Sequence, residues 1–235
     1  GENGVEVAVD SPCVARARLA ADIVHADALV AVSHFKGHEV SGFGGALKNL
    51  SMGCASRAGK LDMHSNTRPF VDEARCTACG RCVAQCASGA IEMGKTARIG
   101  EACSGCARCI LVCPEGAIQV DWNESAENTQ IKMAEYAAAA VRALGGRVVC
   151  FNVLADIVPA CDCYPGNDKP LVGDLGTLAS LDPVALDQAA YDLVKQQAGR
   201  DPFREIYPYL DPAVQLAHAE KIGLGSRRYE LLPID

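Results

Sequence analysis

Two groups of four cysteines carry the clearest chemical signal in this sequence. The chain has 235 residues, of which 13 are cysteine, and eight of these lie between Cys76 and Cys113. Each group of four has the spacing C-x2-C-x2-C-x3-C. In proteins with this spacing, three thiolates hold one 4Fe–4S cluster, and the fourth thiolate reaches the cluster of the other group. The spacing therefore predicts two 4Fe–4S clusters.

Because the fourth cysteine of each group binds the cluster of the other group, each cluster has four cysteine ligands. The first cluster is expected to have the ligands Cys76, Cys79, Cys82 and Cys113. The second is expected to have the ligands Cys103, Cys106, Cys109 and Cys86. Zinc also binds C-x2-C pairs, but usually with a long spacer between the pairs, so zinc fits two tandem quartets poorly. Ala87 stands where the bacterial motif has proline, which is not a ligand, so the predicted ligand set is unchanged.

The cysteine-rich segment is an internal repeat. Residues 76–93 and 103–120 are offset by 27 residues and are identical at 8 of 18 positions. Two copies of a short unit predict a small domain with pseudo-two-fold symmetry. We therefore expect a bacterial-type, two-cluster ferredoxin-like α+β domain at residues 71–122, inserted into a layered α/β domain made of residues 1–70 and 123–235.

A second concentration of reactive side chains follows the apolar run at 28–33. His34, Lys36 and His38 come directly after that run, and glycines at 42, 44 and 45 lead into a short helical pattern. The free N–H groups and dipole of a helix N-terminus favour anions. This pattern predicts a small anionic ligand, with the candidate binding residues Lys36, Gly44, Gly45, Lys48 and Asn49. The alternative is a tight turn with solvated lysines.

The elements that position these side chains alternate between strand and helix. Residues 28–33 and 147–154 have the length and composition of strands. Residues 126–144 and 183–198 have helical apolar periodicity, and the second helix has Asp182 as a candidate cap. This alternation is typical of an α/β layer, in which ligands bind beyond the carboxyl ends of strands.

A third metal site is a further candidate at that edge. If the two strands are parallel, the loops that follow them meet, and a set of soft thiolates and imidazoles comes together. The candidate ligands are His38, Cys54, His64, Cys161 and Cys163, of which His38, His64, Cys161 and Cys163 are also the candidate catalytic residues. The alternative is a set of reduced thiols and hydrogen-bonded histidines. Cys13 and Cys150 are expected to be buried apolar side chains.

Composition narrows the class of protein. The net charge is −7, from 22 Lys and Arg against 29 Asp and Glu, which disfavours a nucleic-acid partner. No apolar run approaches the roughly 18 residues of a membrane span. The sequence begins at Gly1 without a basic or long apolar leader, so no signal peptide is visible. We expect a cytoplasmic, reducing location, in which cysteines bind metal rather than form disulfides.

Several further motifs resemble a known family. They are the segments His34–His38, Gly44–Leu50, Met52–Arg57, His64, Cys161–Cys163, Asp182–Gln188 and Gly223–Arg227. Together with the tandem cysteine motifs, they resemble the ferredoxin-containing branch of the domain-of-unknown-function 362 family along essentially the whole chain. The resemblance implies iron–sulfur clusters and the pocket residues, but no established reaction. It also implies a further N-terminal α/β portion, so we expect this chain to lack an N-terminal portion.

These features favour an iron–sulfur electron-transfer protein whose two clusters relay electrons between a redox partner protein and a site on the α/β domain. One alternative is an iron–sulfur oxidoreductase that acts on a small anionic substrate at the Lys/His/Cys pocket. Another is a carrier of metal or of iron–sulfur clusters, with an additional metal ion bound at the third site. The sequence does not decide whether the protein is an enzyme.

Overall fold

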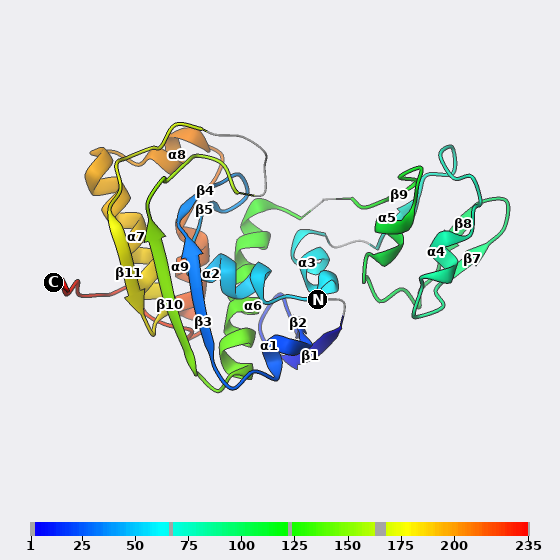
Figure 1. Ribbon diagram of the computed structural model, residues 1–235, viewed down its shortest axis with the longest axis horizontal. Coiled ribbons are helices and arrows are strands. Elements are labelled where there is room, and N and C mark those ends of the chain that lie inside the picture. The colour runs from blue at the N-terminus through cyan, green and yellow to red at the C-terminus, as the bar shows by residue number, and fades with distance from the viewer. Residues whose placement is uncertain (1–2, 66–67, 122–123, 163–167, 235) are drawn as a thin grey trace.

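The protein has a mixed α/β fold with several small sheets. The computed structural model describes residues 3–65, 68–121, 124–162 and 168–234. Figure 1 shows a layered α/β part and, beside it, a smaller part that contains the two cysteine groups. No described helix combines the length and the apolar character needed to cross a membrane.

The largest sheet in the described part of the chain has three strands. β3 (Leu29–His34) and β10 (Val148–Leu154) are parallel, with Val148 opposite Leu29 and Val153 opposite His34. β11 (Gly176–Ser180) pairs antiparallel with the other side of β10. The predicted strands at 28–33 and 147–154 are therefore confirmed, and so is their parallel orientation, which brings the loops after them to one edge of the sheet.

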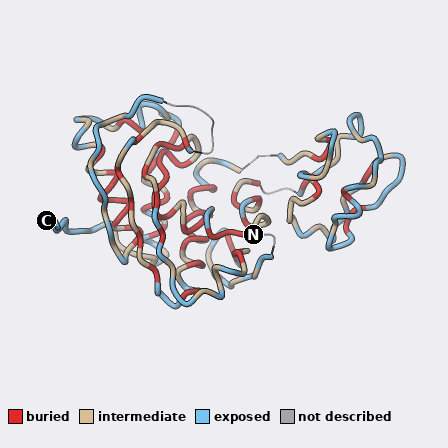
Figure 2. The backbone as a smooth tube through the Cα atoms, in the orientation of Figure 1, coloured by how far each residue is buried: buried red, intermediate tan, exposed pale blue. Residues whose placement is uncertain are grey.

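Four helices on one side of this sheet enclose the main core: α2 and α7 pack directly on the strands, and α6 and α9 pack behind them (Figures 1 and 2). They are α2 (Ala46–Lys48), α6 (Ala126–Ala143), α7 (Pro183–Ala198) and α9 (Ala213–Lys221). Alternate side chains of β10, including Cys150, are buried against them. On the other face Val30 and Val32 are 63% and 60% exposed.

Local sequence signals explain where the two long helices begin and end. The Asp182 carboxylate accepts hydrogen bonds from the N–H groups of Val184 and Ala185, and Pro183 occupies the first turn of α7. Gly199 then ends α7 in the left-handed conformation, with φ +66°. At the start of α6 the Ser125 hydroxyl accepts from Asn128 N at 3.1 Å, and Gly145 and Gly146 follow its end with positive φ. The predicted helices at 126–144 and 183–198 are therefore confirmed.

Shorter elements complete the α/β part. β1 pairs antiparallel with β2, and β4 pairs antiparallel with β5. The bounds are β1 (Gly4–Ala8), β2 (Arg16–Ala20), α1 (Ala21–Val24), β4 (Lys36–His38), β5 (Gly42–Gly44), the π-helical turn η1 (Asn49–Gly53), α3 (Arg57–His64) and α8 (Pro202–Ile206). Cys150 is buried as expected, but the expectation for Cys13 was wrong. Cys13 lies in the segment between β1 and β2, where it is exposed, and its N–H group donates to the Glu135 carboxylate.

The cysteine-rich part has its own elements. β6 (Phe70–Val71) pairs with β9 (Ile118–Gln119), and β7 (Ile91–Met93) pairs with β8 (Ala97–Ile99). α4 (Arg81–Ala84) and α5 (Arg108–Val112) begin at equivalent positions of the sequence repeat. The buried residues of this part form a separate core, made of Cys82, Ile91, Ala97, Cys109 and Ile118.

The backbone reproduces the sequence repeat. Ala78 and Gly80 have positive φ, and so do their counterparts Gly105 and Ala107. After each group of cysteines, the N–H group four residues beyond the last cysteine points at that sulfur: Ala90 N to Cys86 Sγ and Ala117 N to Cys113 Sγ, both 3.2 Å. The two halves of this segment therefore share local geometry as well as sequence.

Candidate functional site

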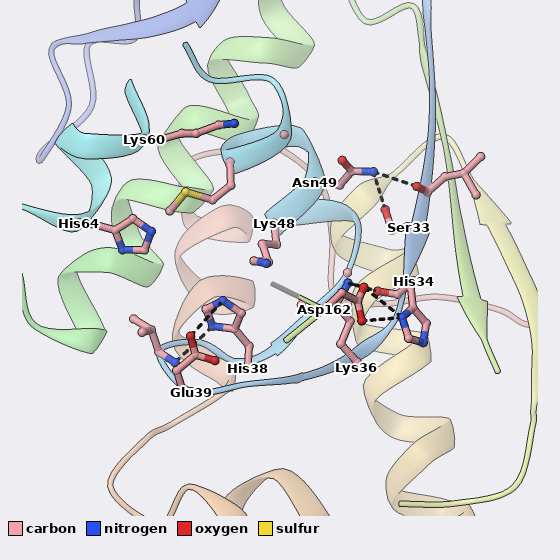
Figure 3. A pocket seen from close by; sticks show the side chains of 16 residues that line it. Ser33, His34, Lys36, His38, Glu39, Lys48, Asn49, Lys60, His64 and Asp162 are labelled. Carbon is pink, nitrogen blue, oxygen red and sulfur yellow. Dashed lines mark hydrogen bonds and ion pairs between the residues drawn. The ribbon is translucent and has the colours of Figure 1, made fainter. Parts of the chain in front are cut away.

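A cavity of about 900 Å³ lies beyond the carboxyl end of β3 (Figure 3). Volumes of this order are typical of ligand sites. The five residues that the sequence predicts to bind an anion all line this cavity, and so do two of the candidate catalytic residues: Lys36, Gly44, Gly45, Lys48, Asn49, His38 and His64. The structure therefore brings these seven residues together at one site.

The π-helical turn η1 fixes one wall of the cavity. The Ser51 hydroxyl donates to the carbonyl oxygen of Leu47 at 2.8 Å. The Asn49 amide donates to Val32 O at 3.0 Å and to Ser33 Oγ at 3.1 Å, which ties the turn to β3. π-Helical turns are rare and occur often at functional sites. Here the turn holds Asn49 against the sheet directly after Lys48.

The N-terminus of α2 binds a carboxylate of the protein itself. Asp187 is fully buried on α7 and accepts from Ala46 N at 2.7 Å, from Leu47 N at 2.8 Å and from Asn152 Nδ2 at 2.7 Å. Burial raises the pKa of Asp187 to about 6 in spite of these donors. Because Asp187 accepts from the N–H groups of Ala46 and Leu47, these two groups are not available to bind an anion in the cavity.

Glycine is required beside this carboxylate. A Cβ atom at position 45 would lie 2.4 Å from Asp187 Oδ1. Gly45 therefore allows close packing against Asp187, and it also lines the cavity with Gly44, where their predicted role in binding an anion stays a prediction.

The loop after β10 meets the segment after β3. Lys36 Nζ lies 2.7 Å from Asp162 Oδ2, and His34 Nδ1 lies 3.1 Å from Asp162 Oδ1. Burial acts to raise the pKa of Asp162, but the hydrogen bonds from Lys36 and His34 hold it below its ordinary value. Lys48 Nζ donates to the buried Cys161 Sγ at 3.1 Å. The two loops therefore meet at the edge where the sequence places them.

His38 is a neutral imidazole in this site. Its Nδ1 accepts from Val40 N at 3.2 Å and from Ser41 N at 3.3 Å, so the ring proton lies on Nε2. Burial, and then the positive charge of Lys48, lowers the pKa of His38 to about 3. Burial likewise lowers the pKa of His64, at the end of α3. His38 can therefore donate a hydrogen bond from Nε2 at neutral pH.

The candidates for a third metal site do not converge in the described part of the chain. Cys54 lies in the main core, where burial raises the pKa of its thiol to about 11, as expected for an unreactive thiol. Cys163 lies outside the described residues. Within the described ranges, no group of three or more His, Cys, Asp and Glu is arranged to hold a metal ion. A third metal site stays a prediction.

The cysteine-rich part contains two much smaller cavities that cysteines line, of about 20 and 10 Å³. The cysteines that line the first are Cys76, Cys79, Cys82 and Cys113. Those that line the second are Cys86, Cys103, Cys106 and Cys109. All eight are free thiols, and each set joins three cysteines of one repeat with the fourth cysteine of the other.

Sequence reasoning missed three side chains of the large cavity. Glu39, Lys60 and Asp162 line it as well. Lys60 and His64 are four residues apart on α3, so helical spacing could have placed them on one face. Asp187 binds the N-terminus of α2 but does not line the cavity. It is an acidic residue within the apolar stripe of α7, and this unusual position is the sequence signal that could have indicated its role.

The fold and its sites define a mixed α/β protein with a polar cavity at the end of two parallel strands and two cysteine-lined cavities in a separate small part. The chain belongs to the family called domain of unknown function 362 (DUF362), whose family model matches residues 1–192. The matched range includes every residue named above for the three cavities. No curated protein and no solved structure matches the chain.

Proposed function

We propose that this protein is an iron–sulfur electron-transfer protein of the ferredoxin-containing branch of DUF362. Residues 71–122 would form the inserted ferredoxin-like domain with two 4Fe–4S clusters, within an α/β domain of residues 1–70 and 123–235. One observation carries the proposal: the eight cysteines line two separate cavities, in the two sets that the exchange of the fourth cysteine requires.

The thiol sets suit a cluster better than a single ion. Four sulfurs bound to one zinc ion, each at about 2.3 Å, must lie close together. Each set of four cysteines instead lines one cavity of its own, as the ligands of a four-iron cluster would. Burial and then the neighbouring Cys103 and Cys106 raise the pKa of Cys109 to about 11, so a bound cluster would have to displace the proton of this thiol.

The protein's own groups around the sulfurs support the same proposal. When bound, 4Fe–4S clusters accept and release single electrons. The N–H groups of Ala90 and Ala117 point at the sulfurs of Cys86 and Cys113, and such hydrogen bonds tune the reduction potential. The twelve free thiols in the described residues also favour a reducing compartment, and we propose a cytoplasmic location and a redox partner protein.

The test is the content of iron, acid-labile sulfide and total metal in protein purified without oxygen. We expect about eight iron and eight sulfide per chain. Cys79→Ala should lose about half of both, because it removes one ligand of the first set. Cys13→Ala is the matched control, since Cys13 is outside both sets. Full cluster content in Cys79→Ala would contradict the ligand assignment.

The large cavity supports a second candidate, a redox enzyme for a small anionic substrate. The cavity carries Lys36, Lys48 and Lys60, and the His38 imidazole beside them can hand over a proton from Nε2. In this candidate Lys48 binds the substrate, Asn49 holds the turn beside Lys48 against β3, and the clusters would supply electrons when bound. Crystals soaked with small acids or phosphate should show density beside Lys48. Empty cavities, together with unchanged reduction of a partner by Lys48→Ala, would count against this function.

The carrier alternative gains no comparable support. It requires Cys54, Cys161 and Cys163 to form a docking site for a labile metal, and Cys54 lies in the main core instead of lining the cavity.

A further inference from the structure

An open groove lies on the surface of the cysteine-rich part, between α4 and α5. It has a volume of about 440 Å³ and is lined by Arg81, Ala84 and Gln85 on one side and by residues 111–114 on the other. α4 packs on α5 and β7, and α5 packs on α4 and β9. The groove is therefore an outer surface of this part, and no described element covers it.

The groove reaches a residue of the first cysteine set. Cys113 lines both this groove and the first cysteine cavity. It is also the cysteine that the second repeat contributes to the first set. On the other side Gln85 lines both the groove and the second cysteine cavity. A protein seated in the groove would therefore lie against a ligand residue of the first cluster.

The lining of the groove is largely apolar. Leu111 of α5 is 66% exposed, and Ala84, Val112 and Pro114 lie beside it in the groove. The small core of this part has few apolar side chains, and Leu111 is not among them. Exposed apolar patches with polar neighbours mark interaction sites. The position of Leu111 therefore indicates that another molecule covers the groove.

The charge of the groove indicates what kind of molecule this is. Arg81 is the one charged residue in the described lining, and it is exposed and forms no ion pair with another described residue. Its counterpart in the repeat, Arg108, is half-buried and lines the second cysteine cavity, and Glu115 lines the first. On a chain with a net charge of −7, this local cation favours a partner with acidic residues at its contact surface.

We propose that this groove docks an acidic electron-transfer protein whose redox group exposes an apolar edge, as a flavin does. Leu111 and Pro114 contact the apolar edge, and Arg81 pairs with a carboxylate beside it. The electron enters past Cys113: one electron leaves the reduced flavin, one electron enters the first cluster, and no bond forms between the proteins. The inference rests on the proposed electron-transfer function and names the class of the redox partner.

The experiment follows electron transfer from flavodoxin, an acidic protein with an exposed flavin edge, to the complete chain with its clusters. Fully reduced flavodoxin is mixed with the oxidised protein in a stopped-flow instrument without oxygen. The one-electron oxidation of the flavin and the loss of cluster absorbance are recorded. Reduced methyl viologen, a small donor that needs no docking surface, is the control donor. We expect both donors to reduce the protein.

Variants test the two features of the groove. Arg81→Glu should lower the rate constant with flavodoxin at least tenfold, whereas Arg98→Glu, the same change at an exposed residue of β8, should lower it less than threefold. Leu111→Ser should lower it at least fivefold, and Leu181→Ser, at an exposed leucine after β11, should leave it unchanged. Arg81→Lys keeps the charge and should retain at least a third of the rate constant. Rate constants with viologen should be equal in all of them.

Three results would overturn the proposal. They are no reduction by flavodoxin of protein that viologen reduces, an unchanged rate constant in Arg81→Glu, and equal losses in Arg81→Glu and Arg98→Glu. Iron and sulfide are measured on the same samples. Protein without clusters would reject the proposed electron-transfer function itself. Clusters that viologen reduces and flavodoxin does not would reject this docking surface and leave that function standing.

Discussion

The protonation of His38 is set by its neighbours rather than by solvent. The ordinary pKa of a histidine is about 6.5, and burial beside Lys48 lowers the pKa of His38 to about 3. Between these values the unfolded chain binds a proton that the folded protein does not bind. The free energy of unfolding must therefore decrease as the pH falls below about 6.5.

We expect His38 to cost about 2 kcal/mol of stability between pH 7 and pH 5, because the unfolded state gains the proton over that range. His38→Asn should lack this loss, since asparagine does not titrate and can still accept from Val40 N and Ser41 N. Urea unfolding of both proteins, followed by a signal from the α/β part, measures the difference. An equal loss in His38→Asn would show that other groups cause the pH dependence.

A close backbone approach holds the second loop at the cavity. Gly37 N donates to Val158 O at 2.8 Å. A Cβ atom at position 37 would lie 1.8 Å from Pro159 O, so only glycine allows this contact. The contact positions the segment that carries Cys161 and Asp162.

Gly37→Ala should therefore lower the free energy of unfolding by about 1–3 kcal/mol, as an overpacked side chain does. It should also weaken ligand binding, because the loop must move away from Lys36 and Lys48. Gly173→Ala is the control, since a Cβ atom there meets nothing within 4 Å. Equal unfolding free energies for the two variants would disprove the role of Gly37.

Among the elements, α2 depends most clearly on a distant residue. Its three residues could not form a stable helix alone, and Asp187 of α7 accepts from the N–H groups of Ala46 and Leu47. Asp187→Asn places an N–H group against one of these donors. We expect a loss of about 1–3 kcal/mol of stability, measured by chemical unfolding. Asp192→Asn, on the same helix, is the control, and a similar loss in both would refute the capping role.

The elements also show which features the sequence can predict. The start and end of α7 depend on Asp182, Pro183 and Gly199, which are adjacent in sequence to the turns they shape, so local rules predicted them. The polar segment after β3 was predicted for the same reason. The meeting of the two loops was predicted from the parallel strands, but the individual pairs were not, because Asp187 lies 141 residues from Ala46 and Cys161 lies 113 residues from Lys48. Only packing of the whole chain selects such pairs.

At the scale of the whole molecule, the described residues form two separate cores. The main core draws on residues before 64 and after 132, and the smaller core draws only on residues 71–118. Hydrogen bonds between the two parts include Arg18 Nη1 to Ser104 O at 3.1 Å and Ser65 Oγ to Asp121 O at 2.7 Å. Neither part therefore needs the core of the other to bury its own apolar side chains.

The two parts should differ in how they respond to loss of metal. A segment of about 50 residues buries too little apolar surface to be stable without help, and five of the eleven residues in or against the small core are cysteines. The free energy of metal binding would then be the free energy that folds this segment. The main core contains none of these cysteines and should not depend on metal.

We expect removal of iron by an oxidant and a chelator to unfold residues 71–122 and to leave the α/β part folded. Hydrogen exchange is the measurement: amides of β7, β8 and β9 should lose protection, whereas those of α6 and β10 should keep it. Protein kept with its metal through the same steps is the control. Loss of protection in α6 and β10 as well would mean that the two cores fold as one unit. Full protection in β7 and β8 would mean that the small core is stable by apolar packing alone, which its five cysteines and few apolar side chains argue against.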